Sequence, residues 1–102
     1  MSLLLTSDGL RKLVLNDKKP AIVLFTGDWC PDCRAFKPIW DAWVMRHRDL
    51  ARQVHVPRDG DEWDHWRLDE IPTVSAFSEG REIGRVHGNI SESDVDGLLK
   101  LI

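Results

Sequence analysis

Hydrophobic residues occur along the chain in short runs that are typical of β-strands. The run "AIVLF" at residues 21–25 follows Pro20 and is apolar throughout, as expected of a strand buried on both faces. Alternating or shorter runs predict four more strands, and the last two form a hairpin with Gly84 as the position of a bulge. The five predicted strands span residues 3–5, 21–25, 53–56, 73–77 and 81–87.

Apolar residues at helical spacing lie between these runs. A first helix is predicted over residues 7–16, with Ser7 or Asp8 as its cap. A longer helix is predicted over residues 31–49. Pro38 inside that helix removes one backbone hydrogen bond, which predicts a kink.

The last residues of the chain predict a further helix, and residues 61–68 predict a short helix or an irregular loop. Ser91 and Asp94 form an approximate capping box at the start of this C-terminal helix. Its buried stripe is predicted to comprise Val95, Leu98, Leu99 and Ile102.

The order of these elements indicates the fold class. Strands and helices follow one another as β-α-β-α-β-(α)-β-β-α, which predicts an α/β fold with a central mixed sheet of four to five strands. Helices are expected on both faces of that sheet. A chain of 102 residues without repeats or a flexible linker is expected to form a single domain over residues 1–102.

Charge and hydropathy narrow the classes of partner. The formal net charge is −3 and no basic run is present, so we expect no nucleic-acid partner. No segment approaches the roughly 20 apolar residues of a membrane span, and the first residues do not resemble a signal peptide. We therefore expect a cytoplasmic monomer that does not bind membranes and has reduced thiols at rest.

The two cysteines, Cys30 and Cys33, are separated by only two residues in "TGDWCPDC". A structural disulfide closing so small a loop would constrain the unfolded chain very little. A zinc site would need two more ligands, and no two of the four histidines have the spacing of a zinc finger. We expect no metal, and a redox couple is the leading interpretation.

The position of this pair at the start of a predicted helix gives each cysteine a role. Cys30 would face unpaired backbone N–H groups and the positive end of the helix dipole, which favour a thiolate. Pro31 suits the first helical position. Cys30 is therefore predicted to attack a substrate disulfide, and the more shielded Cys33 to resolve the mixed disulfide.

The chain resembles the thioredoxin family in several motifs. These are W-C-x-x-C at residues 29–33, Pro38 five residues after the second cysteine, "IPT" at 71–73, and the glycines Gly80 and Gly88. The resemblance implies a thioredoxin fold and a thiol–disulfide oxidoreductase. It also implies that the couple Cys30–Cys33 works without a further cofactor, on disulfide-containing protein substrates, with a thioredoxin reductase or a similar electron donor.

The resemblance further assigns the groove beside the dithiol. It implies that Pro72 is in the cis conformation and faces the dithiol, and that Trp29 shields the sulfurs. The residues expected to contact the substrate are Trp29, Pro31, Ile71, Pro72 and Gly88.

Two departures from the family pattern concern the active site. The motif reads "WCPDC" where the family usually has W-C-G-P-C, which resembles a subgroup that acts on a narrower range of disulfides. The buried aspartate of the family would fall at Leu24. One hypothesis is that Asp32 replaces it as proton acceptor for Cys33, and the alternative is that Asp32 only caps the helix and tunes the potential.

Other interpretations remain open on the sequence. A glutaredoxin-like enzyme that uses glutathione and a non-catalytic binding module on the same fold are the alternative functions. The acidic segment "DGDEWDHWRLDE" at residues 59–70 leads into Pro72 and is expected to favour basic or neutral partners over acidic ones.

Overall fold

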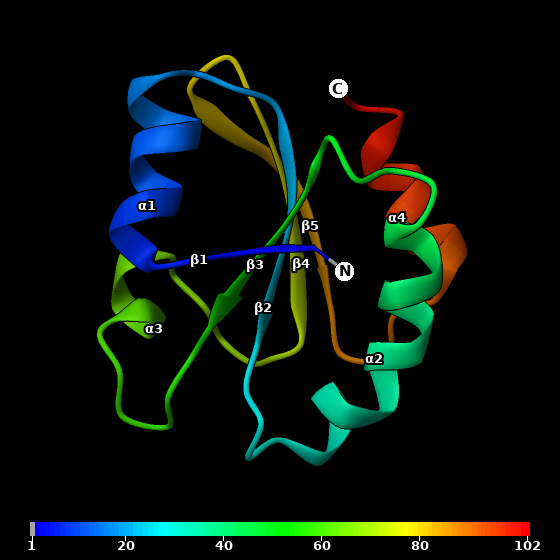
Figure 1. The fold of residues 1–102 in the computed structure, drawn as a ribbon. Coiled ribbons are helices and arrows are strands. Elements are labelled where there is room, and N and C mark those ends of the chain that lie inside the picture. Colours follow the sequence, from blue (N-terminus) through cyan, green and yellow to red (C-terminus); the bar gives the residue numbers. More distant parts are fainter. Residues whose placement is uncertain (1) are drawn as a thin grey trace.

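The computed structural model describes residues 2–102 and shows a five-stranded sheet with helices on both faces (Figure 1). The predicted order of elements and the mixed α/β sheet are confirmed. Along the chain the elements are β1 (Leu3–Leu5), α1 (Ser7–Arg11), the π-helix η1 (Lys12–Asn16), β2 (Ala21–Thr26), α2 (Pro31–Val44), β3 (Ala51–His55), α3 (Glu62–His65), β4 (Thr73–Ser78), β5 (Arg81–His87) and α4 (Glu92–Leu99).

The strands lie in the order β1-β3-β2-β4-β5, with β2 at the centre. Strand β3 pairs in parallel with β1 and with β2, whereas β4 pairs antiparallel with β2 and with β5. Helices α1 and α3 cover one face of the sheet, and α2 and α4 cover the other (Figure 1). The chain leaves the carboxyl end of the central strand and enters α2, so the cysteines lie at that edge of the sheet.

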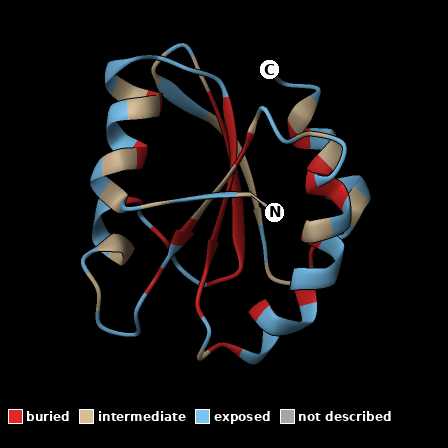
Figure 2. Ribbon diagram, in the orientation of Figure 1, coloured by how far each residue is buried: buried red, intermediate tan, exposed pale blue. Residues whose placement is uncertain are grey.

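The sheet separates two hydrophobic cores, because successive residues of the buried strand β2 point to opposite faces. Figure 2 shows the central strands largely buried, in red, between helices that are exposed on their outer sides. Val23 and Phe25 belong to the core that includes residues of α1. Ile22 and Leu24 belong to the core that includes residues of α2 and α4. Trp40 and Trp43 are fully buried in this second core, as predicted from their place on the long helix.

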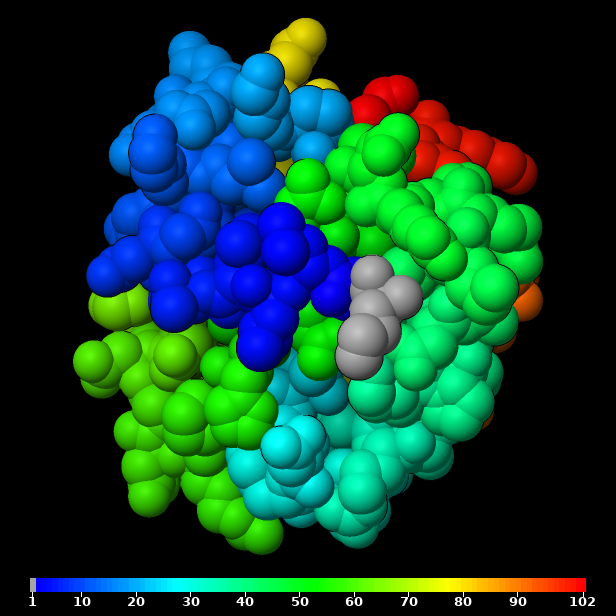
Figure 3. Space-filling model, viewed as in Figure 1, coloured from blue at the N-terminus to red at the C-terminus, as the bar shows by residue number. Residues whose placement is uncertain are grey.

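Strand β1 is the edge of the sheet that carries exposed apolar side chains. Leu3 and Leu4 are each more than half exposed, and Figure 3 shows this dark blue segment at the surface between the first and second helices. No helix among residues 2–102 has the length and apolarity to cross a lipid bilayer.

The first two predicted helices each differ from the structure at one end. Thr6 caps α1 in place of Ser7 or Asp8, because its extended backbone lets the hydroxyl accept a hydrogen bond from the Gly9 amide at 3.0 Å. Helix α2 ends at Val44, and not at Asp49.

The early end of α2 has a local cause. The amides of Arg46 and His47 bond to carbonyl groups only three residues back, which tightens the chain into turns. Pro38 lies inside α2, as the sequence predicts, and the kink at that position stays a prediction. Strand β3 begins at Ala51, two residues before the predicted start, and ends at His55.

The C-terminal hairpin and helix follow the predictions except in the buried stripe, where Leu99 is only partly buried and the last residue is exposed. Ala76 pairs with Gly84 and Phe77 pairs with Glu82, so Ile83 is the extra residue of a bulge next to Gly84. The capping box between Ser91 and Asp94 has both of its hydrogen bonds. Ile102, however, is 41% exposed, because α4 ends at Leu99 and no longer directs later residues toward the sheet.

Candidate active site

The two thiols lie at the N-terminus of α2 and are both free and buried. Cys30 is the N-cap residue, with an extended backbone at φ −97° and ψ 115°, and Pro31 occupies the first turn. The amide of Cys33 donates a hydrogen bond to the sulfur of Cys30 at 3.2 Å. A sulfur in the N-cap position takes the place of the side-chain oxygen that usually satisfies this amide, and an anionic sulfur accepts such a bond more strongly than a neutral one.

Cys33 lies three residues further along, in the first turn of α2, and is the more buried of the two cysteines, at 3% exposed. Burial raises the pKa of the Cys33 thiol from the ordinary 9.0 to about 11, and the hydrogen bond with the Cys30 side chain acts in the same direction. The backbone of Gly27 and the hydroxyl of Thr26 lower that pKa by hydrogen bonding. These two groups at the end of β2 therefore favour the anionic form of the second thiol.

The segment before β4 places a second wall of the site against the dithiol. The Ile71–Pro72 peptide bond is cis, and the Cys30 thiol donates to the Ile71 carbonyl at an S···O distance of 3.6 Å. The amide of Gly88, at a φ of +82°, donates to the Pro72 carbonyl at 3.3 Å. The segment of the cis bond thus lies against Cys30, and the segment at Gly88 is bonded in turn to Pro72.

Trp29 is held beside this wall by its own contacts. Its indole N–H donates to the Val56 carbonyl at 2.8 Å, and its ring lies 6.3 Å from the ring of Trp63. The guanidinium of Arg58 lies 4.7 Å from the ring centre, which is within the range of a cation–π interaction. The ring is therefore fixed between the start of α2 and the loop after β3.

Asp32 is exposed, and among residues 2–102 it forms no hydrogen bond with either sulfur. The N-cap residue of α2 is Cys30, and Asp32 is the acidic residue of its first turn. That Asp32 tunes the redox potential stays a prediction. Asp32 as a proton acceptor through a water molecule stays a prediction. Leu24, at the position of the family's acid, is 1% exposed and packs with the apolar residues that face α2.

Side chains of the acidic segment and of the histidines form local pairs. Glu70 pairs with His87 at 2.5 Å next to Gly88, and both side chains are about half exposed. His47 stacks on Trp43 at 4.3 Å. In the part of the chain that the structure describes, no three histidine, cysteine or acidic side chains lie together in a way that would hold a metal ion.

Sequence reasoning missed Thr26, Gly27 and Arg58. Thr26 lies two residues after Leu24 in β2, so strand alternation directs it to the same face, toward α2. A Cβ atom at Gly27 would lie 2.6 Å from the indole nitrogen of Trp29, which explains the glycine in "TGDWC". Arg58 meets Trp29 only through the fold, and no local pattern announces that contact.

A scan against protein-family models matches the thioredoxin model over residues 2–100. The chain belongs to the thioredoxin family. The arrangement described above, a W-C-x-x-C pair at a helix start facing an I-P-T segment, therefore occurs in a thioredoxin domain.

Curated members of the thioredoxin family agree with this membership. Thioredoxin H2-1 of Oryza sativa subsp. japonica is 30% identical over 88 residues, which are 85% of this chain and 61% of the rice protein. Thioredoxin of Buchnera aphidicola is 22% identical over 98 residues, covering 93% of this chain and 90% of that protein. The chain thus spans about three fifths of the rice relative's length.

Solved thioredoxin structures superpose on the whole fold. Oxidized thioredoxin O2 of Arabidopsis thaliana has a TM-score of 0.78 at 16% identity, covering 99% of this chain and 93% of that one. A mutant thioredoxin of Halobacterium salinarum has a TM-score of 0.79 at 19% identity, covering 98% and 88%. At these identities the likeness concerns the fold.

Proposed function

We propose that this thioredoxin-family protein is a thiol–disulfide oxidoreductase that reduces protein or small-molecule disulfides through Cys30 and Cys33. The observation that carries the proposal is the hydrogen bond from the Cys33 amide to the Cys30 sulfur at the start of α2. That bond and the helix dipole stabilise a thiolate, which is the form that attacks disulfides.

The reaction proceeds by two exchanges at sulfur. The Cys30 thiolate attacks one sulfur of the substrate disulfide, so a bond from Cys30 to that sulfur forms and the other substrate sulfur leaves as a thiolate. Cys33 then loses its proton and attacks the Cys30 sulfur. The Cys30–Cys33 disulfide forms, the second substrate thiol is released, and two electrons have passed from the protein to the substrate.

The groove wall aligns the substrate for the first exchange. The Ile71 carbonyl lies 3.6 Å from the Cys30 sulfur, and the Pro72 carbonyl accepts from the Gly88 amide. Trp29 and Pro31 directly precede and follow Cys30 in the chain. A substrate chain lying there would be held by main-chain contacts, which suit many sequences. An external dithiol donor, such as a thioredoxin reductase in the cytoplasm, would restore the reduced pair.

Reduction of insulin by dithiothreitol tests the proposal. The wild-type protein is expected to accelerate the appearance of insulin precipitate, and Cys30→Ser and Cys33→Ser are each expected to fall to the rate of dithiothreitol alone. Ser93→Ala, at an exposed position of α4, is the matched control and should retain the full rate. A wild-type rate no greater than that of dithiothreitol alone would contradict the proposed function and favour a non-catalytic binding module.

A further inference from the structure

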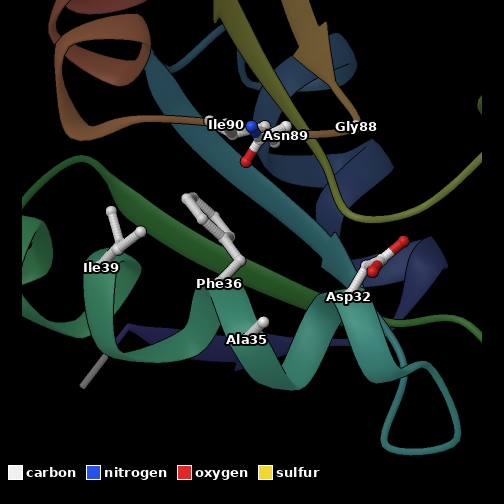
Figure 4. A pocket seen from close by; sticks show the side chains of 7 residues that line it. All are labelled: Asp32, Ala35, Phe36, Ile39, Gly88, Asn89 and Ile90. Carbon is white, nitrogen blue, oxygen red and sulfur yellow. The ribbon is translucent and has the colours of Figure 1, made fainter.

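A cavity of about 260 Å³ lies between α2 and the segment that follows β5, and one of its lining residues, Asp32, stands between the two cysteines in the sequence (Figure 4). Its volume is many times the roughly 30 Å³ that one water molecule occupies in the liquid. The residues that line it are Asp32, Ala35, Phe36, Ile39, Gly88, Asn89 and Ile90.

The wall that α2 contributes is a single stripe of the helix. Asp32 lies three and four positions before Ala35 and Phe36, and these adjacent residues lie four and three positions before Ile39, so all four share one side of the helix. In Figure 4, Phe36 points from α2 toward Asn89 and Ile90, and Asp32 stands at the end of the stripe near Gly88. The wall that α2 contributes is therefore apolar along Ala35, Phe36 and Ile39 and carries the Asp32 carboxyl group at one end, while Asn89 adds a polar side chain on the opposite wall.

The charge of Asp32 is not balanced within the described part of the chain. Arg34 directs its guanidinium to the Asp28 carbonyl at 2.8 Å, and Lys37 pairs with Asp41 at 3.1 Å. Neither of these neighbouring cations pairs with Asp32, which forms no ion pair among residues 2–102. An unpaired carboxylate at one end of an apolar channel complements a long side chain that has methylene groups and a terminal positive charge.

We propose that this cavity is a substrate subsite that takes a lysine or arginine side chain near the reactive cysteine of a protein disulfide. The methylene groups would lie along Ala35, Phe36 and Ile39, and the cation would pair with Asp32. Gly88 lines this cavity and donates to the carbonyl of Pro72, and Ile71, the residue before Pro72, accepts from the Cys30 thiol, so these contacts connect the cavity to the attacking cysteine. The subsite rests on the proposed reductase function and makes Asp32 a residue that determines specificity.

Disulfide-bonded peptides that differ at one position test the subsite. Each position from three residues before to three residues after the cysteine carries alanine, methionine, lysine or glutamate in turn, and kcat/KM for reduction is measured. At one of these positions, kcat/KM of the wild-type protein should be highest for lysine, followed by methionine, alanine and glutamate. The step from methionine to lysine is expected to be roughly two- to fivefold, as for an exposed ion pair.

Two variants and one control identify the contacts. In Asp32→Asn, kcat/KM for the lysine peptide should fall to the value for the methionine peptide. Ala35→Met, at an exposed position, should fill the cavity, so that kcat/KM for both peptides falls to the value for the alanine peptide. Asp41→Asn alters the net charge equally but lies outside the cavity lining, and it should retain the wild-type order.

The outcomes separate the two proposals. Equal reduction of all peptides, or a lysine preference that survives in Asp32→Asn, would overturn the subsite and leave the reductase function intact. Failure to reduce any peptide would overturn both.

Discussion

The amide of Cys33 donates a hydrogen bond to the sulfur of Cys30 at 3.2 Å, so the second residue of the redox pair helps to hold the first. The bond is the N-cap interaction of α2, with sulfur as the acceptor. When Cys30 is anionic, the bond and the dipole of the helix stabilise it together. The first turn of α2 therefore contributes to the reactivity of Cys30. Its geometry follows from cysteine at the N-cap and proline at the first helical position.

The hydroxyl of Thr26 is expected to assist the resolving step. Removing it in Thr26→Val should raise the pKa of Cys33 further above its ordinary value, because a hydrogen bond that favours the thiolate is lost. The release of 5-thio-2-nitrobenzoate from its mixed disulfide with Cys30 should then be roughly tenfold slower at neutral pH, since a hydrogen bond to a charged group is worth about 1.5 kcal/mol. Thr26→Ser retains the hydroxyl and should release the chromophore at nearly the wild-type rate; a valine variant that is as fast would refute this role.

Cys33 is also expected to make the stability of the reduced protein depend on alkaline pH. Its pKa is about 11 in the folded protein, above the ordinary 9.0, so the folded state favours the neutral thiol. The stability that Cys33 contributes through this raised pKa is fully present below pH 9 and is lost as the pH rises from 9 toward 11. Urea unfolding at pH 8 and pH 10.5 under reducing conditions should show a larger decrease for the wild type than for Cys33→Ala. Equal decreases would contradict the assignment.

The buried hydroxyl of Ser75 is expected to destabilise the folded protein. Ser75 lies in β4, is fully buried, and its Oγ has no hydrogen-bond partner among the described residues. Ser75→Ala should therefore raise the free energy of unfolding by about 1 kcal/mol, because an unpaired polar group is removed from the core. Thr73→Val is the contrasting variant, since the Thr73 hydroxyl donates to the Glu70 carbonyl at 2.6 Å, and it should lower stability by a similar amount in urea unfolding. A serine variant that is destabilised would contradict the prediction.

Alanine substitutions at two glycines should have opposite effects. In Gly27→Ala the new Cβ would meet the Trp29 indole nitrogen at 2.6 Å and the Val56 carbonyl at 2.9 Å, so the Trp29 hydrogen bond must break or shift. Stability should fall by about 1–3 kcal/mol, and the near-ultraviolet circular dichroism of the tryptophans should change. Gly97→Ala meets no atom within 4 Å in helix α4 and should gain up to about 1 kcal/mol. A spectrum and a stability unchanged in Gly27→Ala would show that Trp29 is not held as described.

Local sequence patterns account for most of the fold. The apolar run of β2, the capping box of Ser91 and the bulge beside Gly84 each depend on residues within a few positions of one another. The predicted cap of α1 was wrong because "TSD" contains three successive residues whose side chains can cap a helix. Only the backbone angles, which the sequence does not show, select Thr6. The predicted end of α2 at Asp49 was wrong because residues 45–49 contain no glycine or proline to mark the stop, although the apolar residues at helical spacing already end at Val44.

The site was predictable where it depends on the motif and not where it depends on tertiary contacts. The places of Cys30, Cys33 and Pro31 follow from a helix that starts after a buried strand. The contact of Trp29 with Arg58 joins residues far apart in the chain, and it exists only because β3 returns beside β2. The position of Thr26 on the face toward α2 could have been predicted from the alternation of side chains along β2.

Trapping of a mixed disulfide tests the central claim most directly. Cys33→Ser, incubated with a disulfide-bonded peptide and analysed by mass spectrometry after proteolysis, should accumulate the peptide on Cys30. The reciprocal variant Cys30→Ser should accumulate far less peptide on Cys33, which is more buried and has the raised pKa. A peptide found on Cys33 with Cys30 left unmodified, or on neither cysteine, would contradict the account in which the sulfur at the start of α2 is the attacking group.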